Sequence, residues 1–294
     1  MGKVRDPSVR LPPIELIRGR VASQPALDVR LLPRTWQRIG HVLLIRFPKE
    51  LKAWKEFLAP IYADVLRVET VVEDVAGIQG PWRVPEIVRI WGGGTETEHR
   101  ENGVRFKLDV AKVMLSSGNL NERMRIARIG MRGETVVDLF AGIGYFSLPI
   151  AVHARPSRII ACEVNPTAYD YLMENIRLNR AGVVEPRLGD CRGSAPKGIA
   201  DRVIMGHFEA EKYLDVAFDA CKASATLHVH GLSRLENRIS GMNLLHDTPP
   251  ETRRVLQTTA ERHGYRLADV AAHFVKWYGP HRAHIVVDAS VLRN

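Results

Sequence analysis

Two glycines and the acid before them form the stretch of this sequence with the clearest chemical potential. In VVDLFAGIGYFS, Asp138 ends an apolar run and is followed by Gly142 and Gly144. Glycines at such a position let the backbone pass close to a ligand at a helix N-terminus, beyond the carboxyl end of a strand. The segment therefore predicts a loop that binds a nucleoside or a nucleotide.

Two further acids end the apolar runs that follow. Glu163 lies about twenty residues after the glycines, where a carboxylate can accept hydrogen bonds from both hydroxyls of a ribose. Asp190, in GDCR, closes the next run and could receive an adenine amino group. The structural alternative, in which Asp138 and Asp190 cap loops and Glu163 is solvated, fits less well with acids at three successive strand ends.

The spacing of the glycines separates two cofactor classes. A dinucleotide fingerprint requires a third glycine three positions after the second, and this chain has Ser147 there. S-adenosylmethionine fits better, because its sulfonium and ammonium groups favour carboxylates and it has no phosphate to be held. The residues expected to bind it in this region are Asp138, Phe140, Gly142, Gly144, Glu163, Val164, Asp190 and Cys191.

A repeated pattern of strands and helices after about residue 111 would position these side chains. Short apolar strands are expected at 135–140, 158–163, 184–188, 201–205, 225–230, 267–272 and 283–288, with helices at 145–153, 167–180, 210–222 and 249–263. This alternation predicts an α/β fold with a doubly wound, mostly parallel Rossmann-like sheet and an antiparallel edge.

The first 110 residues have a different organisation. Residues 1–30 hold four prolines among scattered arginines and predict a basic arm that is irregular or partly helical. Strands at 41–47, 68–72 and 86–91, a helix at 48–65 and a hairpin over 96–110 that turns at Asn102-Gly103 indicate a small α+β domain. We therefore expect an arm (1–30), an RNA-binding or linking domain (31–110) and a catalytic domain (111–294).

The composition limits the class of protein. The 294 residues are 45% hydrophobic and 26% charged, as in folded globular proteins, and three cysteines without a Cys-x-x-Cys pair argue against a zinc ribbon or a disulfide framework. No apolar run approaches the roughly twenty residues of a membrane helix, so we expect a soluble, cytoplasmic protein. The net charge is +9, and residues 1–60 hold twelve basic and five acidic residues, which favours a polyanionic partner.

Longer segments of the chain resemble a known family. DLFAGIGYFS, EVNPTAYDYLMENIRLN, DRVIM, LPRTW, GGGTETEH and KWYGPHRAHIVVD resemble the archaeal and eukaryotic class I enzymes that modify the guanosine 3′ of the tRNA anticodon. The family has two branches, the guanine-N1 methyltransferases and the wybutosine-pathway enzymes that transfer a 3-amino-3-carboxypropyl group. The resemblance implies S-adenosylmethionine as cofactor and the anticodon stem-loop of a tRNA, tRNA(Phe) in the wybutosine branch, as partner.

Two segments distinguish these branches. After the fourth strand of the sheet, the methylating enzymes carry Asn-Leu-Pro or Asn-Pro-Pro, whereas this chain has Met205-Gly206-His207-Phe208. Before the sheet they carry Ser-Pro-Arg, whereas this chain has Ser116-Ser117-Gly118-Asn119. Both departures favour aminocarboxypropyl transfer to C7 of 4-demethylwyosine at tRNA position 37. Guanine-N1 methylation, a small-molecule methyltransferase and a non-catalytic RNA-binding relative remain as alternatives.

Several polar residues could serve this chemistry. Ser117, Asn119 and Arg123 could bind the cofactor carboxylate, although Arg123 could instead share a solvated helix face with its neighbouring arginines. His207 is the candidate catalytic residue, which would orient or deprotonate the acceptor base, and its alternative is loop packing.

Other residues are candidates for RNA or metal binding. Those expected at the RNA are Arg34, Arg38, Arg83 and Lys276, with Trp36, Trp82, Trp277 and Tyr278 as stacking platforms, of which Trp36 and Trp82 are equally compatible with a core position. His228 and His230 alternate on one strand. A buried hydrogen-bonded pair is favoured over a metal site there, because no third ligand is evident.

Overall fold

A computed structural model describes residues 11–79, 84–115, 117–234, 244–245 and 248–294 of the chain, which folds into two compact units. The first unit holds Met1–His99 and Lys107–Leu115, and the second holds Arg100–Phe106 and Ser116–Asn294. The chain passes between the units within a hairpin of strands β5 (Glu96–Glu101) and β6 (Val104–Asp109). Asn102 and Gly103 turn this hairpin with φ angles of 55° and 77°, as the Asn-Gly pair predicts.

The first unit is built on a four-stranded sheet with the order β1-β2-β3-β4. The parallel pairing of β2 and β3 requires a crossover, which a 3₁₀ helix and α2 supply. The expected single helix at 48–65 was wrong in detail, because Lys49–Trp54 form that 3₁₀ helix and the α-helix begins at Lys55. Strand β1 was not expected. The elements are α1 (Pro13–Val21), β1 (Trp36–Ile39), β2 (Val42–Ile45), η2 (Lys49–Trp54), α2 (Lys55–Leu66), β3 (Thr70–Gln79) and β4 (Val84–Gly92).

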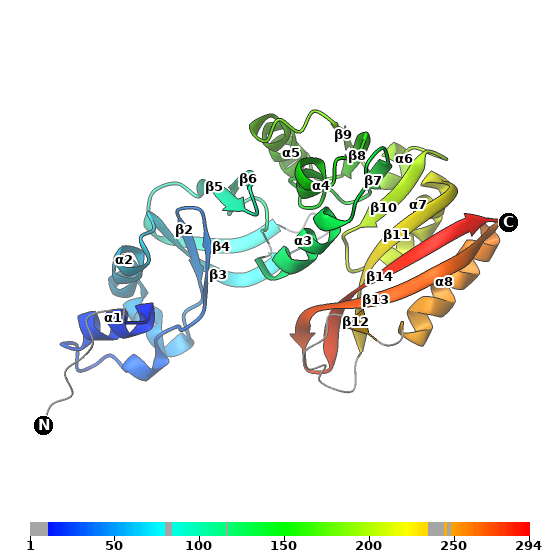
Figure 1. The fold of residues 1–294 in the computed structure, drawn as a ribbon. Coiled ribbons are helices and arrows are strands. Elements are labelled where there is room, and N and C mark those ends of the chain that lie inside the picture. Colours follow the sequence, from blue (N-terminus) through cyan, green and yellow to red (C-terminus); the bar gives the residue numbers. More distant parts are fainter. Residues whose placement is uncertain (1–10, 80–83, 116, 235–243, 246–247) are drawn as a thin grey trace, which may run out of the picture. The chain divides into compact units, whose positions relative to one another are not determined.

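The second unit contains an eight-stranded sheet with the order β12-β13-β14-β11-β10-β7-β8-β9 (Figure 1). The five strands from β11 to β9 are parallel, and β14 and β13 add antiparallel pairs at one side. This confirms the expected doubly wound sheet. The strands are β7 (Thr135–Asp138), β8 (Arg158–Glu163), β9 (Val184–Leu188), β10 (Ala200–Met205), β11 (Cys221–Arg234), β12 (Leu244–Leu245), β13 (Tyr265–Gly279) and β14 (Arg282–Arg293).

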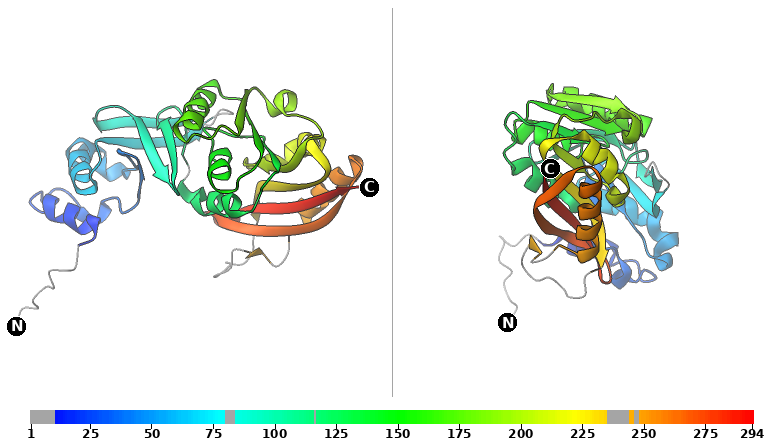
Figure 2. Two further views of the ribbon diagram at one scale, coloured as in Figure 1. Left: turned by 45° about the horizontal axis from the view of Figure 1, so that its top comes forward. Right: turned by 90° about the vertical axis from the view of Figure 1, so that its right-hand side faces the viewer.

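Helices cover both faces of this sheet (Figure 2). Val229 and Val287 join the apolar core with Leu256 of α8, whereas His228 and Asp288, the next residues along their strands, face α3 through Arg125. Neighbouring residues of a strand point to opposite faces, so α3 and α8 lie on opposite sides. The helices are α3 (Leu120–Arg128), α4 (Ser147–His153), α5 (Pro166–Leu178), α6 (Cys191–Ser194), α7 (Leu214–Ala220) and α8 (Pro250–Arg262), with η3 (Ser117–Asn119) and η4 (Ala210–Tyr213).

The boundaries of the elements depart from the expectations mainly at the antiparallel side. β11, β13 and β14 are each at least twice as long as the apolar runs that predicted them, because a long ladder with two partners stabilises their polar ends. The helix expected at 210–222 is divided into η4 and α7, and its last two residues begin β11. Across the described ranges, no helix has the length and apolar character needed to span a bilayer.

Candidate functional site

The strand order of the second unit creates a switch point beside β7, whose neighbours β8 and β10 lie on opposite sides of it. Ligands of doubly wound proteins bind beyond the carboxyl ends of the strands at such a point. Backbone hydrogen bonds hold the strand ends together: Leu139 N donates to Ile204 O at 3.0 Å, and Gly189 N donates to Glu163 O at 2.8 Å. The segments that carry the three predicted acids and His207 therefore leave the sheet at one end.

The glycine loop between β7 and α4 is closely packed. Gly142 has a φ of 57° and Gly144 a φ of 101°, a region that residues with a side chain rarely adopt. A Cβ on Gly142 would lie 2.3 Å from a ring carbon of Tyr145, and one on Gly144 would lie 2.5 Å from a methyl carbon of Leu148. Only glycine fits both positions, so the two glycines are required for the conformation of this loop.

Glu163 fastens the glycine loop to the end of β8. One carboxylate oxygen accepts a hydrogen bond from Gly142 N at 2.7 Å, and the other accepts one from Asn165 N at 2.7 Å. Burial raises the pKa of this carboxyl, while those backbone donors act against the rise. A carboxylate offers about four acceptor positions, so both oxygens can still accept ribose hydroxyls. The adjacent Val164 is 45% exposed and offers an apolar surface beside them.

Asp138 is completely buried and holds the loop from its other end. It accepts hydrogen bonds from Ser147 Oγ at 2.7 Å and from Phe140 N at 3.2 Å. Burial raises its pKa to about 6. Ser147, which replaces the third glycine of the dinucleotide fingerprint, is thus the partner of Asp138. The sequence offered no signal for this bond beyond the presence of a hydroxyl at that position.

Asp190 follows β9 and caps α6 by accepting a hydrogen bond from Arg192 N at 2.8 Å. Its carboxylate also pairs with the Arg192 guanidinium, which holds its pKa below the ordinary value. Arg192 lies over the ring of Tyr213, and Tyr213 packs edge-on against Phe140 at 5.0 Å. The loop-capping alternative is thus present in the structure, and a contact of Asp190 with adenine stays a prediction.

Cys191, the first residue of α6, is a buried thiol. It is 4% exposed, and burial raises its pKa to about 12. A buried thiol with so high a pKa is protonated at neutral pH and is a poor nucleophile. Its expected part in the cofactor site, a contribution through the backbone, stays a prediction.

His207 lies in the turn that follows β10. Its ring is tilted against Phe140 at a centroid distance of 5.3 Å. Its Nδ1 accepts a hydrogen bond from Glu209 N at 3.2 Å. A nitrogen that accepts from an N–H carries a lone pair, so the neutral ring has its proton on Nε2. In this tautomer, Nε2 of His207 carries the N–H and is a hydrogen-bond donor.

A second group of polar residues surrounds the 3₁₀ turn η3. The Oδ1 atom of Asn119 is buried without a hydrogen-bond partner among the described residues. A Cβ on Gly118 would lie 2.5 Å from Nζ of Lys276, so the absence of a side chain lets this ammonium approach the turn. Burial, followed by repulsion from Arg123, lowers the pKa of Lys276. The structure thus brings together Asn119 and Lys276, which the sequence assigned to cofactor and RNA separately. Ser117 belongs to η3, but its side chain is outside the described part of the chain.

Arg123 on α3 forms a buried ion pair with Glu101. Its Nε and one terminal nitrogen donate to the two carboxylate oxygens at 2.5 Å and 2.7 Å, and its side chain is 3% exposed. The solvated-face alternative for Arg123 is therefore wrong. Because the guanidinium is already bidentate to Glu101, we expect Arg123 to shape the η3 turn, and its direct contact with a cofactor stays a prediction.

His228 lies in a buried polar network on the α3 face of the sheet. Its Nε2 accepts a hydrogen bond from Arg202 at 2.7 Å, so its Nδ1 carries the proton and donates to Asp288 at 2.6 Å. His230 instead bonds His284. Both histidines are buried and hydrogen-bonded, although not to each other. Within the described residues, no cluster of three or more His, Cys, Asp or Glu side chains could hold a metal ion.

The remaining RNA candidates are divided between the two units. Arg34 and Arg38 are exposed, and Arg38 donates to Gly40 O at 3.1 Å. Trp36 packs edge-on against the buried Tyr62 and belongs to the core. Arg83 and Trp82 lie outside the described residues. Tyr278, in the second unit, is 55% exposed.

The fold and the site together define a class. A mostly parallel sheet in which β14 runs antiparallel to both of its neighbours, a glycine loop after β7 and an acid at the end of β8 are features of Rossmann-like class I transferases that use S-adenosylmethionine. The TRM5/TYW2 methyltransferase domain matches residues 97–264, and the TYW2 N-terminal domain matches residues 15–95. The chain belongs to the TRM5/TYW2 family.

Similar proteins come from both branches of this family. The tRNA(Phe) (4-demethylwyosine(37)-C(7)) aminocarboxypropyltransferase of Methanocaldococcus jannaschii is 39% identical over 88% of this chain and 98% of its own length. The tRNA (guanine(37)-N(1))-methyltransferase Trm5b of Pyrococcus abyssi is 34% identical over 89% of this chain and 76% of its own. The crystal structure of Pyrococcus horikoshii TYW2 in complex with MeSAdo is 33% identical, with a TM-score of 0.82 over 96% of this chain and all of that one.

Proposed function

We propose that this protein transfers the 3-amino-3-carboxypropyl group of S-adenosylmethionine to C7 of 4-demethylwyosine at position 37 of tRNA(Phe), in the cytoplasm, and releases methylthioadenosine. The observation that carries the proposal is the Gly206-His207-Phe208 turn after β10, which places a histidine against Phe140 of the glycine loop. The match to the TYW2 N-terminal domain and the relative named for this activity support it.

Selection among the electrophilic carbons on the cofactor sulfur is a matter of orientation. The sulfonium supplies three such carbons, and the one that faces the acceptor reacts, because correct alignment contributes a large effective concentration. We expect Glu163 and Val164 to bind the adenosine. Asn119 and Lys276 fit the amino-acid tail of the cofactor. Oδ1 of Asn119, which has no partner among the described residues, can accept a hydrogen bond from the ammonium of the tail, and the Lys276 ammonium can bind the carboxylate of the tail.

His207 is placed to act on the acceptor base. With its proton on Nε2, it can donate a hydrogen bond to an oxygen or nitrogen of the tricyclic base. Such a bond would hold the base in a fixed orientation relative to the cofactor carbon. This tautomer has no lone pair at the outer edge, so we expect His207 to orient the base rather than to remove its C7 proton.

Product analysis tests the proposed reaction directly. The protein is incubated with S-adenosylmethionine and tRNA that bears 4-demethylwyosine, and the nucleoside products are separated. We expect methylthioadenosine, together with a mass increase of the tRNA by one aminocarboxypropyl group. Formation of S-adenosylhomocysteine alone would refute aminocarboxypropyl transfer and show methyl transfer instead. His207→Ala should lower turnover while cofactor affinity stays close to that of the wild type.

The tail assignment has its own test, because methylthioadenosine lacks the tail. Lys276→Met should weaken S-adenosylmethionine binding by about 10- to 150-fold, the effect of one charge-assisted hydrogen bond, and leave methylthioadenosine binding unchanged in calorimetry. Lys197→Met is the control, since Lys197 pairs with Asp219 on the surface. Equal weakening of both ligands, or no change in either, would remove Lys276 from the tail site.

A further inference from the structure

Two histidines on adjacent strands of the sheet form a buried pair. His230 on β11 is 2% exposed and His284 on β14 is 0% exposed, and a hydrogen bond of 3.0 Å joins Nδ1 of the first to Nε2 of the second. Burial lowers the pKa of both rings, that of His284 to about 4. The pair is therefore neutral at physiological pH and shares one proton between the rings.

Each ring also has an outer nitrogen that finds no hydrogen-bond partner among the described residues. These atoms are Nε2 of His230 and Nδ1 of His284. Because two neutral imidazoles carry two protons and one lies between them, one outer nitrogen is an N–H and the other is a lone pair. A buried, unpaired donor destabilises a fold, so two apolar side chains would be more stable here. The stability of the fold therefore does not explain the pair.

The pair is enclosed by two phenyl rings. Phe146 meets His230 edge-to-face at 5.0 Å and 66°, and Phe208 meets His284 edge-to-face at 4.9 Å and 80°. Phe146 is also in contact with the backbone of Gly206, since a Cβ there would lie 2.8 Å from its ring. The histidine pair therefore contacts Gly206, the residue before His207, through Phe146, and it contacts Phe208, the residue after His207, directly.

The strand register places the pair at the level of this turn. Met205, the last residue of β10, is paired with Val229 of β11, so His230 and Gly206 both lie one step further along.

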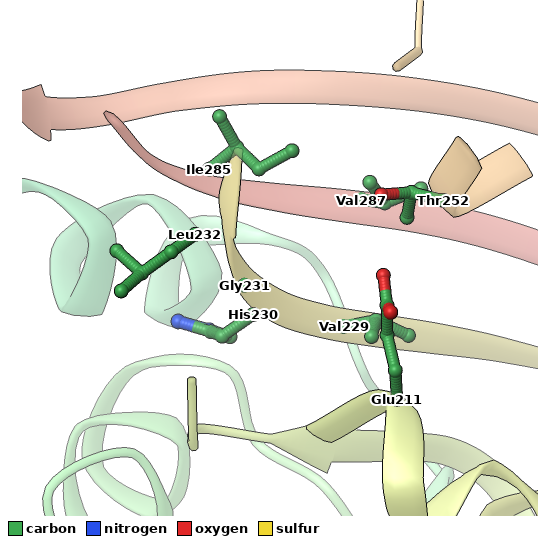
Figure 3. A pocket seen from close by; sticks show the side chains of 8 residues that line it. All are labelled: Glu211, Val229, His230, Gly231, Leu232, Thr252, Ile285 and Val287. Carbon is green, nitrogen blue, oxygen red and sulfur yellow. The ribbon is translucent and has the colours of Figure 1, made fainter. Parts of the chain in front are cut away.

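A small pocket on the other face of β11 and β14 is lined by Glu211, Val229, His230, Gly231, Leu232, Thr252, Ile285 and Val287 (Figure 3). In Figure 3, the His230 ring points away from Glu211.

We propose that His230 and His284 are positioning residues that fix His207 against the acceptor base. The hydrogen bond between the imidazoles fixes both ring planes, and the two edge-to-face contacts pass this orientation to Gly206 and Phe208. Hydrophobic side chains could fill the same volume, but they provide no directional bond. This inference rests on the proposed function, because the aligned group is His207.

The double variant His230→Leu/His284→Leu tests the inference. Removing both partners avoids leaving one imidazole unpaired, so we expect an unchanged or higher melting temperature. We expect kcat for methylthioadenosine release to fall by about 100-fold, the effect of a misplacement of about 1 Å, with little change in KM for tRNA or in the Kd of S-adenosylmethionine. His263→Gln is the control, because His263 bonds Asp215 at the surface end of α8. Turnover within threefold of the wild type would overturn the inference.

Two further measurements keep the inference testable. If the double variant does not fold, Gly206→Ala takes its place: the added methyl displaces Phe146 from His230, and the same selective loss of kcat is expected. The ring resonances of His207 in ¹H–¹³C spectra should shift in either variant, and unchanged resonances would overturn the inference without any assay of activity. A wild-type protein that releases no methylthioadenosine would refute the proposed function instead.

Discussion

Replacement of Asp138 by asparagine should stabilise the protein at neutral pH. Asp138 is 0% exposed, and its pKa is raised from 3.8 to about 6. A pKa difference of one unit corresponds to ~1.36 kcal/mol, so the burial of this charge lowers the free energy of unfolding by about 3 kcal/mol at pH 7. Asparagine removes the charge and keeps both contacts: its oxygen accepts from Phe140 N, and its amide donates to Ser147 Oγ, which can act as an acceptor.

The pH dependence follows from the sign of this shift. Between pH 3.8 and about 6 the folded protein binds the proton of Asp138 more tightly than the unfolded chain does. The contribution of Asp138 to wild-type stability therefore falls as the pH rises through this window. The advantage of Asp138→Asn should be full above pH 7 and absent below about pH 4. For a unit of this size, it amounts to roughly 6–12 °C in melting temperature.

Calorimetric melting of both proteins without ligand, from pH 4 to pH 8, measures this difference. Asp170→Asn is the matched control, because Asp170 is exposed on α5 and its replacement should not change the melting temperature. An Asp138→Asn protein that melts below the wild type at pH 7, or whose advantage persists at pH 4, would refute the reasoning. The first result would show that the loop stabilises the charged form of Asp138, and the second that the gain in stability does not come from removal of the charge.

Three further predictions concern the loop and the RNA. Glu163→Gln should weaken the binding of both S-adenosylmethionine and methylthioadenosine by about 10- to 150-fold in calorimetry, because the two ligands share the ribose. The amide nitrogen of glutamine also cannot accept the hydrogen bond that Gly142 N or Asn165 N donates to the carboxylate. Affinities equal to those of the wild type would exclude Glu163 from the site. Gly142→Ala should destabilise the protein by about 1–3 kcal/mol more than Gly133→Ala, since both glycines have positive φ but only Gly142 lacks space for a Cβ, and equal melting temperatures would contradict this. Arg34→Ala should lower the slope of log affinity for tRNA against log salt by ~1 if Arg34 contacts a phosphate, and a slope equal to that of the wild type would exclude the contact.

Local patterns explain which parts of the site could be predicted. β8 begins and ends where its apolar run predicted, because a parallel strand buried on both faces leaves an uninterrupted run in the sequence. The edge strand β9 also has its predicted bounds, although only Val184 of it is buried. Glu163 follows from the end of β8 and the glycine loop from its two glycines. The alternating antiparallel strands were predicted too short, since their polar ends depend on the partners that the sheet supplies.

Contacts between distant residues explain what could not be predicted. The bond from Ser147 to Asp138 crosses the loop, and Glu101 reaches Arg123 from the hairpin that precedes it. Lys276 meets Gly118 because β13 passes the η3 turn, and no local pattern reports such a meeting. The sequence predicted Lys276 at the RNA and Arg123 at the cofactor, and we propose the tail site for Lys276 because its ammonium lies against the η3 turn.

The sequence by itself determined the class of fold, the glycine loop and the three acids at the strand ends, because hydrophobic periodicity and the φ preferences of glycine are properties of short segments. The tertiary structure decided which charges are already paired, which tautomer His207 adopts and which rings support its turn. These properties depend on burial and on contacts between strands that are far apart in the chain, and only the order of the strands in the sheet creates them.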